Sequence, residues 1–145
     1  MMKTRLGDEY ARIGRAVSLV RRRACPGLSR LLDHVKIMSY THCRATQRKC
    51  GLVGNDVEDL YTNTTRGLYL HDSKTILLHV KNHGRRINVL AETLVHELTH
   101  HALADGPFPD EQEEGFCMLA EQEFRQGRRL HLTRQSKLAR RYIYF

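Results

Sequence analysis

The sequence predicts a small α+β domain with a short antiparallel sheet and two helices that carry the polar residues of a site. A length of 145 residues suits one domain with one modest core. Residues 67–80 alternate apolar and polar side chains as a β-hairpin does. Residues 88–102 and 110–126 place apolar side chains at helical spacing. One domain over residues 1–145, with its core at about residues 67–126, is therefore expected.

The elements ahead of the hairpin are predicted as follows. Residues 8–23 are apolar on one face and rich in arginine on the other, which indicates an amphipathic helix. Cys25-Pro26-Gly27 ends it, residues 28–32 indicate a further helical turn or two, and residues 35–40 indicate a strand. Residues 41–65 are rich in Thr, Asn, Gly and charged residues and predict a long irregular connection.

The hairpin is expected to turn at Asp72 and Ser73, with its outer strand beside the helix that follows. Asn82-His83-Gly84 supplies the next turn. The three histidines of this region, His71, His79 and His83, are interpreted as hairpin surface.

The two helices after the hairpin have recognisable end signals. The first is predicted to begin with Asn88 as N-cap and to end before Gly106. The second is predicted to begin with Asp110 as N-cap, with Glu113 as its capping-box partner, and to end before Gly127.

Charge is distributed unevenly along the chain. Residues 1–50 hold 12 Lys/Arg against 3 Asp/Glu, residues 51–124 hold 5 against 13, and residues 125–145 hold 7 against none. The basic N-terminal helical region (1–50) and the basic C-terminal tail (127–145) could bind nucleic acid or an acidic partner. Because no membrane-length apolar run and no secretory signal are visible, a cytoplasmic protein without membrane attachment is expected.

Residues 95–101 read VHELTHH, which contains the pattern HExxH. On a helix, His96 and His100 share one face with Cβ atoms about 6 Å apart, so both imidazoles can bind one zinc ion. Glu97 then faces the open side of the metal, where it can take the proton of a zinc-bound water as general base. The pattern predicts hydrolysis, because metal binding alone does not need Glu97.

A catalytic zinc takes three protein ligands, so the second helix has to supply another donor. Counting about 1.5 Å per residue along two antiparallel helices brings Glu114 level with His100, and Glu121 nearer to His96. This measure leaves both carboxylates open as the third ligand. Glu113 is expected to be less available because of its capping-box role.

The stretch HELTHHALADGPFPDEQEEGFCMLAE resembles the active-site core of the gluzincin metallopeptidases, closest in spacing to minigluzincins and to the peptidase segment of plant LIM-containing peptidases. The resemblance covers residues 67–124. It implies a zincin-like fold, with Glu114, directly before Gly115, as third zinc ligand. It also implies that the hairpin supplies an edge strand along which an extended peptide or protein substrate binds.

Other protein classes match the same stretch less well. Repressor-cleaving and radiation-response metallopeptidases are similar in element order, but the residues after Glu121 depart from their pattern, and they stay the alternative among peptidases. A metzincin is excluded by Leu103 and Gly106, and an SprT-like site by the poor fit of His101 and His131. The rival from another class is a basic, zinc-stabilised nucleic-acid-binding or adaptor module without turnover, which the presence of Glu97 disfavours.

Other residues near the motif have plainer interpretations. His101 is expected on the flank of the site or behind its ligands, and Cys117 in the core. Tyr69 and His79 are the hairpin residues that could contact substrate. The sequence assigns no role to the following groups: His42, Cys43 and Cys50, which match a second metal site poorly, and Tyr142, Tyr144 and His131, candidates for the oxyanion-stabilising residue.

Overall fold

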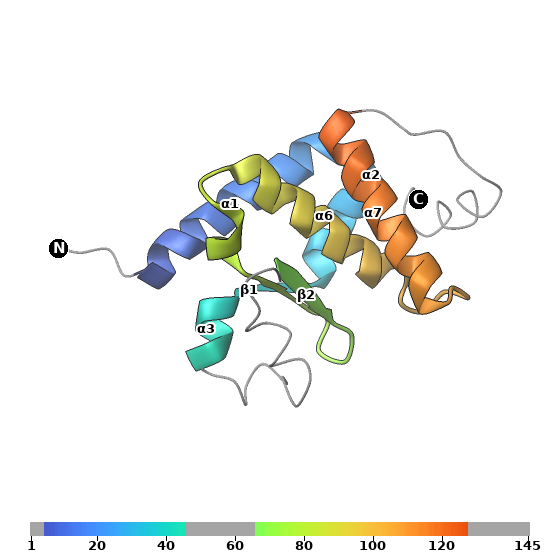
Figure 1. The fold of residues 1–145 in the computed structure, drawn as a ribbon, viewed down its shortest axis with the longest axis horizontal. Coiled ribbons are helices and arrows are strands. Elements are labelled where there is room, and N and C mark those ends of the chain that lie inside the picture. Colours follow the sequence, from blue (N-terminus) through green and yellow to red (C-terminus); the bar gives the residue numbers. More distant parts are fainter. Residues whose placement is uncertain (1–4, 46–65, 128–145) are drawn as a thin grey trace.

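The computed structural model describes residues 5–45 and 66–127 and shows an α+β arrangement that is mostly helical (Figure 1). Its elements, in chain order, are helix α1 (Arg5–Arg23), helix α2 (Pro26–Leu31), a 3₁₀ turn (Leu32–His34), strand β1 (Lys36–Ser39), helix α3 (Tyr40–Ala45), strands β2 (Gly67–Leu70) and β3 (Thr75–Leu78), a second 3₁₀ turn (Val80–His83), helix α6 (Ile87–Leu103) and helix α7 (Asp110–Gln126).

The described strands form one sheet in the order β1-β3-β2. β2 and β3 are the predicted hairpin, antiparallel with Gly67 opposite Leu78, and the chain reverses at residues 71–74 as expected. β1 runs parallel to β3, with Lys36 opposite Thr75. The prediction of an antiparallel sheet is therefore wrong for β1. Two parallel strands cannot be joined by a tight hairpin turn, and residues 40–74, which include β2, lie between β1 and β3 in the sequence.

The central strand β3 is buried on both faces. Ile76 and Leu78 belong to the main core beneath the helices, whereas Leu77 packs with Met38 and Leu70 in a smaller cluster on the opposite face. Figure 1 shows the same division, with α1, α2, α6 and α7 on one side of the sheet and α3 on the other. The continuous apolar run of β3 follows from this double coverage.

Helix α6 is the central element of the helical layer. Its residues Leu90, Leu94 and Leu98 are fully buried, and each contributes roughly 1.5–3 kcal/mol by removal from water. α1 packs on α6 through an apolar stripe at helical spacing that includes Ile13 and Val20. Among the described elements, α7 makes the most extensive contact with α6.

The two helices predicted after the hairpin are present, but they begin at other residues than predicted. α6 begins at Ile87, so Asn88 lies inside it, and α7 has Pro109 rather than Asp110 at its N-cap, without a side-chain cap. Pro109 holds φ −60° and ψ 152°, an extended conformation that suits an N-cap. Asp110 then falls in the first turn, where its carboxylate interacts favourably with the helix dipole. Gly127 ends α7 in the left-handed conformation, as predicted.

Several predictions fall outside the described residues, namely most of the long connection, the C-terminal tail, Cys50 and the side chain of Cys43. No helix within residues 5–45 and 66–127 has both the length and the apolar character needed to cross a membrane.

The interpretation of His79 and His83 as hairpin surface is wrong. His79 is half-buried and stacks on Tyr40 with ring centroids 4.4 Å apart. His83 is buried, with Nδ1 2.8 Å from the carbonyl of His79 and Nε2 2.8 Å from the hydroxyl of Thr93 on α6. The neutral Nδ1–H tautomer satisfies both contacts, because Nδ1 donates to the carbonyl and Nε2 accepts from Thr93. His83 thus joins the turn after the hairpin to α6.

This burial makes the stability of the fold dependent on pH. Burial lowers the pKa of His83 from 6.5 to about 4, so the unfolded chain binds the extra proton between these values. The stabilising contribution is therefore complete above about pH 6.5 and is lost as pH falls towards about 4, on the order of 3 kcal/mol in all. Urea unfolding of wild type and His83→Gln from pH 7 to 4 measures it: the wild type should lose more stability. Parallel curves would contradict the assignment.

Candidate metal centre

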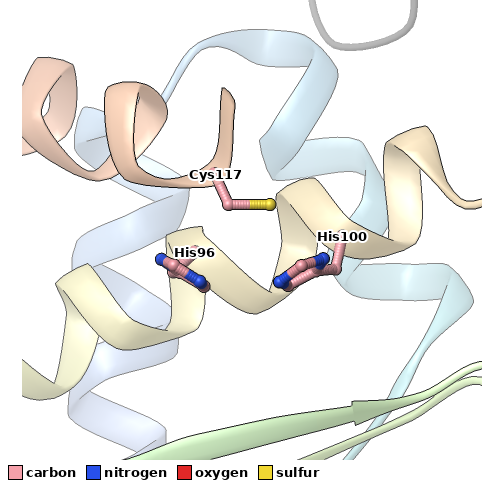
Figure 2. A group of neighbouring side chains, drawn as sticks. All are labelled: His96, His100 and Cys117. Atoms are coloured by element: carbon pink, nitrogen blue, oxygen red, sulfur yellow. The ribbon is translucent and has the colours of Figure 1, made fainter. Parts of the chain in front are cut away.

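His96 and His100 lie one turn apart on the face of α6 that meets α7. Their ring centroids are 5.2 Å apart, and both side chains are mostly buried, with 16% and 21% exposed. Figure 2 shows both rings on the same side of α6. The sequence predicted this shared face from the spacing of four residues.

Glu114 on α7 contacts both imidazoles through its two carboxylate oxygens. Oε1 lies 2.8 Å from Nε2 of His96, and Oε2 lies 2.8 Å from Nε2 of His100. Two donors on one tetrahedral zinc are roughly 3.3 Å apart, which follows from bond lengths of about 2.0–2.1 Å. Glu114 thus bridges the two imidazoles with one oxygen on each.

The outer nitrogen of each imidazole faces a further carboxylate. Nδ1 of His96 is 3.7 Å from Glu121, and Nδ1 of His100 is 3.7 Å from Glu113. These separations exceed a hydrogen bond, but they place an acceptor behind each ring, as around metal-binding histidines. The capping-box role predicted for Glu113 is wrong: because Pro109 occupies the N-cap, the Glu113 side chain faces His100 instead.

Carboxylates dominate the electrostatics of His96. Burial on its own lowers the pKa of His96, but Glu121, Glu97 and Glu114 together raise it above its usual value. A positive charge at the His96 ring is therefore favoured by the surrounding side chains.

Glu97 is buried beside His96, with only 6% of its surface exposed. Its Oε2 atom finds no hydrogen-bond partner among the described residues. Burial raises the pKa of Glu97, and the neighbouring imidazoles of His100 and His96 reduce this increase. A buried carboxylate oxygen without a partner is costly in an ordinary core, and such an atom calls for a functional explanation.

A cleft of ≈ 480 Å³ lies between β2 and the two helices. Residues 67–69 of β2 and His71 form one wall, and the other walls include His96, Glu97 and His100 of α6 and Glu113 and Glu114 of α7. Among the described strands β2 lies at the edge of the sheet. The HExxH residues thus open beside a sheet edge, the arrangement that the hairpin prediction anticipated.

Tyr69, which lines this cleft, forms a hydrogen bond with His101, with Tyr69 Oη 2.7 Å from His101 Nδ1. Burial lowers the pKa of His101 and raises the pKa of Tyr69. Both shifts favour the neutral forms, in which the tyrosine hydroxyl donates to the imidazole. His101 is therefore placed on the flank of the site, as predicted, and it orients Tyr69.

Sequence reasoning assigned Cys117 to the core alone, and it is indeed fully buried. The structure also brings its Sγ into a group with one nitrogen of His96 and one of His100, all within 4.8 Å of one another. The signal was present in the sequence, because Cys117 follows Glu114 by three residues and so shares its helix face.

Comparisons of the chain with protein-family models, with curated proteins and with solved structures found no match.

The close approach of β2 to α6 depends on Gly67. A Cβ atom there would lie 2.9 Å from Cγ2 of Thr93 and 3.3 Å from Cγ of Glu97. Gly67→Ala is expected to destabilise the protein by roughly 1–3 kcal/mol in urea unfolding, because the strand has to move off the helix.

Gly115→Ala is the control for this substitution. A Cβ atom at Gly115 would meet nothing within 4 Å, and alanine in a helix is favoured by roughly 0.5–1 kcal/mol. The control should therefore unfold at equal or higher urea concentration. Equal destabilisation by both substitutions would show that β2 does not press on α6 in solution.

Zinc binding tests the ligand set directly. The wild type is expected to bind about one zinc per chain, and a His96→Ala/His100→Ala variant none. Glu114→Ala should lower the affinity more than Glu121→Ala, because only Glu114 contacts both Nε2 atoms. Competition with a chromophoric chelator measures the affinities. Glu111→Ala, an exposed residue of the same helix, is the charge-matched control. A larger loss with Glu121→Ala would transfer the third position to that residue.

Proposed function

We propose that this protein is a zinc-dependent peptidase of zincin-like arrangement, in which His96, His100 and Glu114 hold the metal and Glu97 is the general base. One observation carries the proposal: the two oxygens of Glu114 lie 2.8 Å from the two Nε2 atoms, and the nearby buried Glu97 has one oxygen without a hydrogen-bond partner among the described residues. Two imidazoles and a carboxylate are a donor set that catalytic zinc takes.

The chain's own residues account for the remaining requirements of hydrolysis. When bound, zinc lowers the pKa of a coordinated water towards about 7 and polarises the substrate carbonyl. Glu97 follows His96 on α6, so the helix backbone fixes its carboxylate next to the metal ligands and inside the cleft. There it can accept the proton of the attacking water and deliver it to the leaving amine.

The cleft also supports a peptide as substrate. Its β2 wall is a sheet edge among the described strands, and free backbone N–H and C=O groups on an edge pair with an extended chain. Such pairing holds a backbone over the site with little dependence on side chains. Unfolded or extended protein segments are therefore the proposed substrates.

Glu97→Gln separates binding from chemistry. The amide keeps the size of the side chain but cannot accept a proton, so cleavage of a fluorescently labelled unfolded protein should fall by about 10²- to 10⁴-fold. Zinc content and circular dichroism should match the wild type, which shows that the loss is chemical. Glu111→Gln, on an exposed position of α7, is the matched control and should cleave at the wild-type rate.

Two outcomes would overturn the proposal in different ways. Full activity in Glu97→Gln would assign the base to another residue. A zinc-loaded wild type that cleaves no peptide or protein would favour a zinc-stabilised binding module over an enzyme.

A further inference from the structure

Cys117 occupies an unusual place for a core cysteine. It lies one turn beyond Glu114 on α7, and its side chain is fully buried. Figure 2 shows the Cys117 side chain between the α7 and α6 ribbons, opposite the stretch of α6 that carries His96 and His100. A buried cysteine usually packs as a small hydrophobic residue, whereas this sulfur shares its surroundings with the polar edges of two imidazoles.

The two helices present matched pairs of donors. α6 supplies His96 and His100 at a spacing of four residues, and α7 supplies Glu114 and Cys117 at a spacing of three, so each pair shares one helix face. The sulfur and one nitrogen of each imidazole lie within 4.8 Å of one another. On a tetrahedral zinc a sulfur and a nitrogen ligand would be roughly 3.6 Å apart. Binding of one ion would bring the sulfur and the two nitrogens to this spacing.

A second observation points to a cation at this place. The buried Oε2 atom of Glu97 finds no hydrogen-bond partner among the described residues, and Glu97 lies with His96 and His100 on one wall of the cleft. Two imidazoles and an unpaired buried carboxylate oxygen lie beside this thiol, and an apolar core would contain neither the imidazoles nor the carboxylate. A bound divalent cation accounts for all of them together.

We propose that Cys117 is a ligand of the metal, and that with His96, His100 and Glu114 it closes a four-donor set for zinc in the resting protein. On binding, the S–H bond breaks, the proton passes to solvent and the thiolate forms the Zn–S bond. This inference rests on the proposed metal centre and adds a regulatory property to it. Four protein donors leave no position for water, so hydrolysis requires the thiolate to leave first.

Cobalt(II) distinguishes this arrangement without any assay of activity. The cobalt-loaded full chain should show an intense thiolate-to-metal charge-transfer band in the near ultraviolet, along with the visible bands of a tetrahedral ion. Cys117→Ser should abolish the charge-transfer band. Loss of a residue that only orients a metal ligand lowers metal affinity by roughly 10- to 100-fold. Cys117→Ser should therefore lower zinc affinity by at least this factor. Cys25→Ser, at the other described cysteine, is the matched control and should keep band and affinity.

X-ray absorption of the zinc-loaded wild type keeps the test independent of how Cys117→Ser folds. One sulfur at about 2.3 Å from zinc supports the proposal, and a shell of nitrogen and oxygen alone overturns it. A charge-transfer band that persists in folded Cys117→Ser also overturns it, because another cysteine would then be the ligand. A sulfur-free site that still cleaves peptides refutes the closed set and leaves the proposed function intact. The proposed function and the four-donor set both require that the wild type binds zinc and that His96→Ala/His100→Ala loses all metal binding.

Discussion

The packing of α7 against α6 is the constraint on which the rest of the structure depends. One stripe of α7, including Phe116, Ala120 and Phe124, joins the main core, and Arg125 pairs with Glu92 of α6 at 2.8 Å near the far end. These contacts fix the helices along and around their axes. The apolar packing therefore determines which polar side chains of α6 and α7 face one another.

That alignment gathers like charges, which creates an electrostatic problem. Glu97, Glu113, Glu114 and Glu121 surround the two imidazoles, and Glu97 is buried without a partner for one oxygen. Carboxylates at this density repel one another in a partly dehydrated seam. The raised pKa of His96 reflects the same field, which a cation between the helices would relieve. The architecture therefore favours a positive charge at the point where the donor atoms converge.

The sequence specified the elements better than it specified their contacts. Alternation predicted the hairpin, and helical periodicity with Gly127 predicted α7, because these signals are local. The choice between Glu114 and Glu121 needed the rotation of α7 about its axis, which depends on distant core contacts. Cys117 counted as an apolar residue in the periodic pattern, which hid its neighbours. His83 was misplaced because turn sequences do not reveal what packs over them. The strand β1 was predicted, but its parallel pairing with β3 was not, because such pairing is non-local.

The sheet edge and the candidate metal centre form one structural unit. Gly67 allows β2 to lie so close to α6 that a single Cβ atom would collide with Thr93, and the same contact covers Glu97. Tyr69, two residues after Gly67 and on the same face of β2, has its hydroxyl 2.7 Å from Nδ1 of His101. A strand displaced outward would expose Glu97 to water and widen the cleft at the same time. Under the proposed function, a peptide that pairs with β2 would therefore also change the surroundings of Glu97, so binding along the edge and hydrolysis at α6 are expected to be coupled through this contact.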